Sequence, residues 1–225
     1  GFPIAEKIDM ELTSDSPFHI AGAMGTIVQK MSKALMELQP DLLVLISDRF
    51  EVLAAAVAAS PFTIPIVHIA GGVVTEGAID DKMRHAVTKL SHVHFPVDEA
   101  GAANLRAMGE EDWRITVSGS MAMDLLKSEA TYSQEELEKL LGIDFSQGVI
   151  LFVYHPVTLE YQDTERQIAN ALEAVLSFNM QVVALYPNQD TSRQIIAAEL
   201  EKTAGKYPHL KLVDHLRREA YGSLL

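Results

Sequence analysis

The sequence alternates short apolar runs with longer amphipathic stretches, and this alternation constrains the fold more than any other feature of the chain. Each apolar run is followed by a loop that carries Asp, Gly, His or Asn before the next amphipathic stretch begins. Continuous apolar strands of this kind are buried on both faces, as in parallel sheets that are covered by helices. The sequence therefore predicts an α/β fold with parallel sheets.

The predicted elements follow this alternation, and the second half of the chain repeats the scheme of the first. Strands are expected at residues 42–46, 66–69, 93–97, 115–117, 149–154, 182–186 and 210–213. Helices are expected at residues 20–38, 50–59, 82–89, 99–108, 164–178, 191–203 and 218–225.

Residues 127–148 separate the two halves. This segment contains a helix-capping box in Ser133 and Glu136, a short helix, and Gly142 placed to end that helix. We therefore expect a domain boundary here, with one domain in residues 1–126 and a second in residues 127–225.

The composition limits the partners of the chain. Lys and Arg number 18 against 31 Asp and Glu, and the net charge of -13 argues against an extended surface for nucleic acid or an anionic membrane. The chain has no cysteine, which excludes disulfides and thiolate catalysis. No apolar run approaches the roughly 20 residues that span a bilayer, and no signal segment opens the chain. A cytoplasmic enzyme or binding module is expected, without a metal site because no H-x-x-x-H or HExxH pattern occurs.

The polar residues that follow the apolar runs are candidates for chemistry, because ligands of open α/β sheets bind at the carboxyl ends of the strands. Asp48 and Arg49 stand where a strand gives way to a helix, whose N-terminus offers free amides to an anion. Arg49 can add a bidentate grip on a diphosphate. Asp48 can also act only as the N-cap of the helix, and its position alone leaves this alternative open.

A glycine-punctuated loop at residues 71–81 leads into the next predicted helix. Asp81 and His85 have i, i+4 spacing and so share one face of that helix, and Arg84 follows Asp80 at the same spacing. A solvated helix with a capped start is the alternative. The candidates from this loop and helix are Gly71, Gly72, Glu76, Asp80, Asp81, Arg84 and His85.

The second half adds two candidates at strand ends. His155 follows an apolar strand and precedes a proline that blocks helix continuation, so its imidazole is expected to project at the strand end. Asn188 follows the apolar run at residues 182–186. An isolated histidine can equally be structural, so His155 gains weight from the other clusters.

Four stretches carry a family resemblance. SDRFEVLAAAVAA resembles a GDRFE element, and HIAGGVVTEGAIDDKMRHAVTKLSHVHF resembles HIxGGExTEGAIDDxIRHAITKLSHLHF. YHPVT and LYPNQD resemble HPVT and FPNxD elements. The stretches occur in the order seen in hydrolysing UDP-N-acetylglucosamine 2-epimerases, the family of sialic acid and legionaminic acid synthesis that this chain resembles, and the resemblance extends over nearly the whole chain.

The resemblance implies two Rossmann-like domains that face each other across a cleft in a GT-B-like fold, the second binding the nucleotide. It implies elimination of UDP from UDP-N-acetylglucosamine and hydration of the resulting 2-acetamidoglucal to N-acetylmannosamine, without a cofactor. It assigns catalysis to Asp48, Asp80 and His155. It assigns substrate contacts to Arg49, Arg84 and Asn188, and we group the remaining candidates of the loop and helix with them. A homodimer or homotetramer is also implied.

The chain departs from the family pattern at three places. Ser47 replaces a glycine, Ala70 stands where a polar residue is usual, and Val73 stands where an acid is usual. The family's TGTRADYG and NSSSG loops do not occur in this sequence, so a chain truncated at both ends is expected. Two alternatives stay open: the same chemistry on a UDP- or GDP-linked diacetamido-trideoxy sugar, and a nucleotide-sugar-binding module with impaired catalysis. GGVVTEGAIDD argues against a glycosyltransferase of similar architecture.

Overall fold

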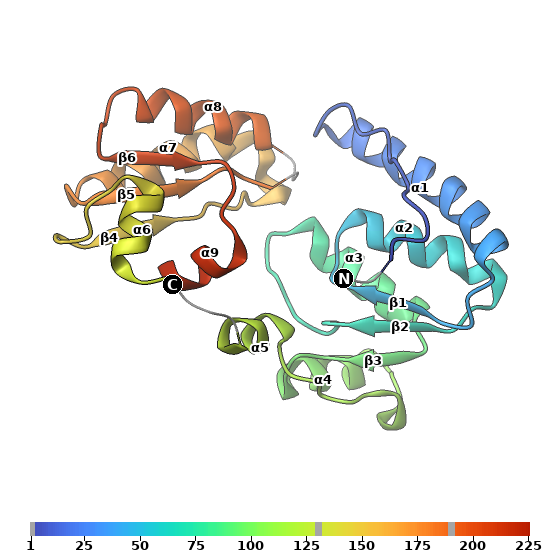
Figure 1. Ribbon diagram of the computed structural model, residues 1–225. Coiled ribbons are helices and arrows are strands. Elements are labelled where there is room, and N and C mark those ends of the chain that lie inside the picture. Colours follow the sequence, from blue (N-terminus) through green and yellow to red (C-terminus); the bar gives the residue numbers. More distant parts are fainter. Residues whose placement is uncertain (1–2, 129–131, 189–191) are drawn as a thin grey trace. The chain divides into compact units, whose positions relative to one another are not determined.

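The computed structural model describes residues 3–128, 132–188 and 192–225 of the chain. The chain divides into two compact units, Gly1–Ser120 and Met121–Leu225, which Figure 1 colours from blue to green and from green to red. The boundary expected between residues 126 and 127 falls inside helix α5 (Met121–Ser128), which opens the second unit.

The first unit is built on a parallel three-stranded sheet in the order β1-β2-β3. Its strands are β1 (Leu43–Ile46), β2 (Ile66–Ile69) and β3 (Val93–Phe95). Its helices are α1 (Pro17–Leu38), α2 (Phe50–Ala59), α3 (Ile79–Leu90) and α4 (Glu99–Ala107), with the 3-10 helices η1 (Ser60–Phe62) and η2 (Asp112–Arg114). Helix α2 packs between α1 and α3 and against β1, so this row of helices covers the sheet (Figure 1).

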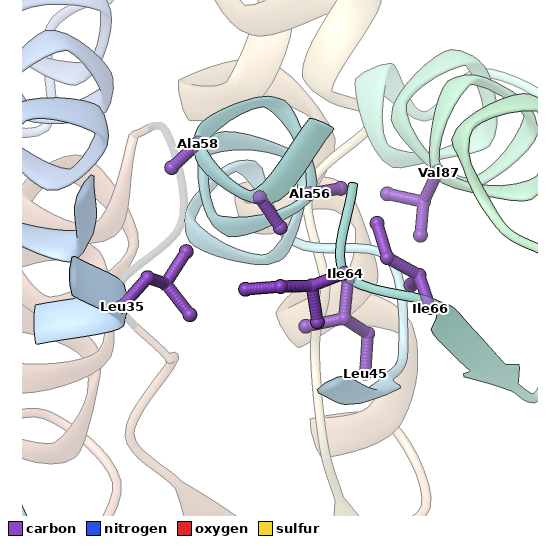
Figure 2. Packing of buried hydrophobic residues seen from close by; sticks show 8 residues of the cluster. Leu35, Leu45, Ala56, Ala58, Ile64, Ile66 and Val87 are labelled. Carbon is purple, nitrogen blue, oxygen red and sulfur yellow. The ribbon is translucent and has the colours of Figure 1, made fainter. Parts of the chain in front are cut away.

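The core of the first unit lies between these helices and the sheet. Figure 2 shows Leu35 of α1, Ala56 of α2 and Val87 of α3 pointing toward Leu45 and Ile66 of the sheet. Helix α2 is apolar nearly all round, which is typical of a helix that is buried on most sides. Its small alanine side chains let the helix approach the sheet and both neighbouring helices closely.

The second unit repeats the plan with a parallel sheet in the order β4-β5-β6. Its strands are β4 (Val149–Phe152), β5 (Gln181–Leu185) and β6 (Leu210–Val213). Besides α5, its helices are α6 (Gln134–Leu141), α7 (Thr164–Leu176), α8 (Arg193–Ala204) and α9 (Arg218–Leu224), with the 3-10 helix η3 (Thr158–Asp163). Ile168 and Leu172 of α7 meet Val182 of β5 and Ile196 of α8 in its core. The predicted α/β class with parallel sheets is confirmed in both units.

The capping box is confirmed at the start of α6. The Ser133 hydroxyl accepts a hydrogen bond from the Glu136 amide at 3.3 Å, and the Glu136 carboxylate accepts one from the Ser133 amide at 2.8 Å. Gly142 follows the helix with a φ of 65°, a left-handed conformation that glycine adopts without steric cost.

The strand predicted at residues 115–117 is wrong. Ile115 makes only an isolated bridge to His94, although the amides of Thr116 and Ser118 donate to the carbonyls of His94 and Pro96, both at 3.0 Å. Pro96 has no N–H to return a hydrogen bond, so no regular ladder extends along β3.

Several predicted boundaries also differ from the structure: β3 ends at Phe95 and not at residue 97, and α3 begins at Ile79 and not at residue 82. Strand β4 ends at Phe152, its last pairing with β5, before the predicted end at residue 154. The predicted helix at residues 191–203 corresponds to α8, but residue 191 and the end of the LYPNQD motif lie outside the described residues. No helix among the described residues is both long and apolar enough to cross a membrane.

Candidate active site

The candidate residues follow the carboxyl ends of adjacent parallel strands in each unit. In the first unit Asp48 follows β1 and the glycine loop follows β2. In the second unit His155 follows β4 and Asn188 follows β5, and both side chains are exposed. Neighbouring parallel strands end at the same edge of a sheet, so each unit gathers its candidates at one edge.

Asp48 and Arg84 form the centre of the site in the first unit. Arg84 lies on α3, is only 5% exposed, and pairs through Nη2 with Oδ2 of Asp48. The other carboxylate oxygen of Asp48 accepts a hydrogen bond from the Ser47 hydroxyl at 2.6 Å. The second Arg84 nitrogen, Nη1, donates to the Val73 carbonyl at 2.7 Å. The guanidinium therefore holds Asp48 and the glycine loop at once.

Asp81 extends this cluster along the first turn of α3. It accepts a hydrogen bond from the Thr75 amide at 2.8 Å and lies 3.4 Å from Nη1 of Arg84. Its other oxygen lies 3.6 Å from Nε2 of His85. The shared helix face predicted for Asp81 and His85 is confirmed, and Asp81 also fixes the loop before the helix.

Arg49 stands beside Asp48 as the N-cap of α2, so the alternative in which Asp48 caps this helix is wrong. The side chain of Arg49 bonds Glu51 at 2.7 Å through Nε and lies over the ring of Phe50. Arg49 has an extended backbone, and α2 begins directly after it. The Asp48 carboxylate therefore pairs with Arg84 and not with the helix amides.

The glycine pair is explained by close packing. A Cβ on Gly71 would lie 2.8 Å from Nδ1 of His68 and 3.2 Å from Oγ1 of Thr88. Gly72 has a φ of 80°, and a Cβ there would overlap the backbone carbonyl of Gly101 at the start of α4. Because neither glycine has a Cβ, the loop can pack closely against its neighbours. The contact of both glycines with substrate stays a prediction.

The remaining candidates of the first unit lie on the loop and in the first turn of α3. Glu76 is exposed at the tip of the loop, and Asp80 is half-buried beside Asp81. Among the described residues no group of three or more His, Asp or Glu side chains is placed to hold a metal ion.

His68 is the site residue that the sequence reasoning missed. It lies in the middle of β2 with no exposed surface, and its imidazole bonds the Ser47 carbonyl. Burial lowers the pKa of His68 to about 4, so the ring is neutral near pH 7. The available signal was a titratable side chain in the middle of an otherwise apolar strand.

The fold and the site together define the class of protein. Two α/β units with parallel sheets and polar residues at their carboxyl edges are the Rossmann-like units of GT-B-like proteins. The solved structure of UDP-GlcNAc 2-epimerase from Neisseria meningitidis bound to UDP-GlcNAc has this fold, with a TM-score of 0.74 at 18% identity over 95% of this chain and 59% of that one. The particular family follows from the family model described as UDP-N-acetylglucosamine 2-epimerase, which matches residues 1–225. The chain belongs to this family.

Curated relatives agree with this assignment. The GDP/UDP-N,N'-diacetylbacillosamine 2-epimerase (hydrolyzing) of Campylobacter jejuni is 33% identical over 100% of this chain and 59% of its own length. The UDP-N,N'-diacetylbacillosamine 2-epimerase (hydrolyzing) of Legionella pneumophila is 31% identical over 98% and 58%. The UDP-N-acetylglucosamine 2-epimerase of Neisseria meningitidis is 31% identical over 81% and 48%. The chain thus spans somewhat over half the length of the first two relatives.

Proposed function

We propose that the full-length protein is a hydrolysing sugar-nucleotide 2-epimerase that converts UDP-N-acetylglucosamine to N-acetylmannosamine and UDP. The observation that carries the proposal is the cluster of Asp48, Arg84 and Asp81 at the carboxyl edge of β1 and β2, in a chain that belongs to this family. The pairing with a buried arginine fixes the orientation of the carboxylate, as acid or base work on a sugar requires.

The proposed reaction has two steps. A base removes the proton from C2 while the C1–O bond breaks, and UDP leaves with the bonding electron pair, which gives the 2-acetamidoglucal. Water then adds across the C1–C2 double bond. Its hydroxyl bonds to C1, and C2 receives a proton on the face opposite to the one from which the first proton was removed. Asp48, Asp80 and His155 supply the acid and base groups, and Arg49 and Asn188 contact the diphosphate and nucleotide.

A second substrate is favoured by a specific observation. Two of the relatives carry names that specify N,N'-diacetylbacillosamine, a diacetamido-trideoxy sugar, as the epimerised group. The same elimination and hydration apply to this sugar, because the extra acetamido group at C4 does not take part. The two substrates differ only in what the pocket must accept around C4 and C6.

The test uses the full-length protein with UDP-N-acetylglucosamine and with the UDP- and GDP-linked diacetamido sugars in separate reactions. We expect nucleotide release together with a free sugar inverted at C2, measured by chromatography and proton NMR. The sugar with the larger kcat/KM identifies the substrate. Binding of UDP without any sugar product would instead identify a nucleotide-sugar-binding module, for which Ala70 and Val73 in place of the family's polar residues are the sequence reason.

A further inference from the structure

His68 connects two strands and a helix behind the candidate site. Its Nε2 lies 3.0 Å from the backbone carbonyl oxygen of Ser47, at the end of β1, and its Nδ1 lies 3.2 Å from Oγ1 of Thr88 on α3. A carbonyl oxygen can only accept a hydrogen bond, so Nε2 must carry the proton. Nδ1 of the neutral ring is then the acceptor, and the Thr88 hydroxyl donates to it. These contacts determine both the tautomer and the orientation of the imidazole.

Ser47 has a backbone conformation that needs such support. Its φ of 79° lies in the left-handed region, which residues other than glycine rarely adopt. The Ser47 amide donates to the carbonyl of Ile69 at 3.2 Å, its carbonyl accepts from His68, and its hydroxyl donates to Asp48. All its polar groups are therefore engaged, and two of these bonds come from β2.

Asp48 takes its direction from this turn. Its backbone follows Ser47 directly, and one of its carboxylate oxygens is held by the Ser47 hydroxyl at 2.6 Å. The other oxygen then faces Arg84. A rotation of the Ser47 peptide would move both the backbone and the hydroxyl that place the carboxylate. Loss of placement by about 1 Å lowers the rate of a catalytic group by roughly 100-fold.

We propose that His68 is a positioning residue for Asp48, because its Nε2–H holds the Ser47 carbonyl and thereby the turn that directs the carboxylate to Arg84. This inference rests on the proposed function, in which Asp48 takes part in acid or base chemistry. His68 has no exposed surface, so it acts through Ser47 and does not touch the substrate.

The experiment compares two substitutions in the full-length protein. His68→Leu removes the Nε2–H donor and puts an apolar side chain of similar volume in its place. His68→Gln supplies an amide N–H that can reach the Ser47 carbonyl. We expect His68→Leu to lower kcat about 10- to 100-fold with KM changed less than about threefold, because only the placement of a catalytic group changes. His68→Gln is expected to recover most of this loss. A general structural defect would not be repaired selectively by one donor atom.

The matched control is His92→Gln, at the amino end of β3. His92 is exposed, and its Nδ1 accepts a hydrogen bond from the Ile66 amide at 3.1 Å. We expect the control to keep the kcat of the parent.

If the His68→Leu variant does not fold, Thr88→Val tests the same orientation of the imidazole by removing the partner of Nδ1. This variant should lower kcat about 3- to 10-fold. Equal kcat in the parent and in the folded His68→Leu variant, or in Thr88→Val, would overturn the inference.

A second readout does not depend on turnover. Nitrogen NMR of the His68 ring is expected to show a proton on Nε2, and exchange of the Ser47 amide should be at least about 10-fold faster in His68→Leu than in the parent or in His68→Gln. A proton on Nδ1, or unchanged exchange, would contradict the role of His68. A parent that turns over none of the sugars fails the proposed function instead, and the NMR and exchange data then decide the role of His68 by themselves.

Discussion

Ser47 and Ala70 end two neighbouring parallel strands with positive φ angles of 79° and 64°. For residues other than glycine this conformation costs about 1 to 2 kcal/mol. It persists where the surroundings determine the backbone, and here the Ser47 amide bonds Ile69 at 3.2 Å while the Ala70 amide bonds Phe95 at 2.9 Å. A hydrogen bond to the neighbouring strand thus fixes the backbone of each of these two residues. The two residues in turn determine the angle at which the polar loops leave the sheet.

The pKa of His68 makes the stability of the first unit depend on pH. Burial lowers this pKa from 6.5 to about 4, so the unfolded chain takes up the proton first as the pH falls. The contribution of the neutral His68 imidazole to the free energy of unfolding is about 3 kcal/mol. It is fully present above about pH 6.5 and is lost as the pH falls toward about 4. Hydrogen exchange of the β2 amides at pH 7, 5.5 and 4 measures it.

The His68→Gln variant is the control for this pH dependence. It should keep the loss of stability at low pH that comes from His94, whose pKa burial also lowers. A parent and a variant with the same dependence on pH would show that the imidazole of His68 is not the group responsible.

At the scale of the elements, β2 is the central strand of the sheet in the first unit, and the loop after it contacts several neighbouring elements. The loop packs on β2 through Gly71 and on α4 through Gly72, whose carbonyl accepts a hydrogen bond from Asn104 at 2.8 Å. Arg84 of α3 then ties the same loop to the end of β1. The position of the candidate site therefore depends on four elements, β1, β2, α3 and α4, that are joined through one loop.

Alanine substitutions of the loop glycines test this packing. Gly72→Ala combines a left-handed backbone with overlap on the Gly101 carbonyl and should lower the free energy of unfolding by at least about 2 kcal/mol. Gly71→Ala presses on the His68 ring and should cost about 1 to 3 kcal/mol. Gly22→Ala, in an exposed and uncrowded turn of α1, should stabilise the protein by about 0.5 to 1 kcal/mol. Urea titration measures the three values, and a Gly72→Ala variant as stable as Gly22→Ala would contradict the packing argument.

A second network joins α3 to β3 by charge. The Glu110 carboxylate bonds Lys89 at 2.5 Å and the buried His94 at 3.1 Å. Burial alone would raise the pKa of Glu110, but the hydrogen bonds from Lys89 and His94 lower it, so the carboxylate stays ionised. This pairing leaves Lys89 with a structural role on the helix that carries Arg84.

At the scale of the whole molecule, the candidate catalytic groups are divided between the two units. Asp80 belongs to the first unit and His155 to the second. Because the proposed elimination and hydration need acid and base groups on the same sugar, we expect both residues to be required for turnover.

Asp80→Asn and His155→Ala in the full-length protein should each lower kcat by about 100-fold or more, the usual scale for an acid or base group, while the fold survives. Asp112→Asn and His209→Gln, a carboxylate on η2 and a histidine before the amino end of β6, are the matched controls and should keep the parent rate. Steady-state kinetics with circular dichroism measures this. Parent-like turnover of either site variant would remove that residue from the chemistry.

The elements could be predicted from the sequence because burial periodicity is a local property. The apolar run at β2 and the alanine-rich α2 show their burial in a few consecutive residues. The strand expected at residues 115–117 failed for a reason outside the segment, since Pro96 on the neighbouring chain segment lacks the N–H that a ladder needs.

The sequence by itself determined two α/β units with parallel sheets and placed Asp48, the glycine loop, His155 and Asn188 after their strands. Only the tertiary structure decided which polar groups meet. Arg84 reaches Asp48 across 36 residues of chain, and His68 reaches Ser47 because the register sets Leu45 opposite His68. Strand register and helix approach result from packing over the whole unit, and no local pattern of residues contains them.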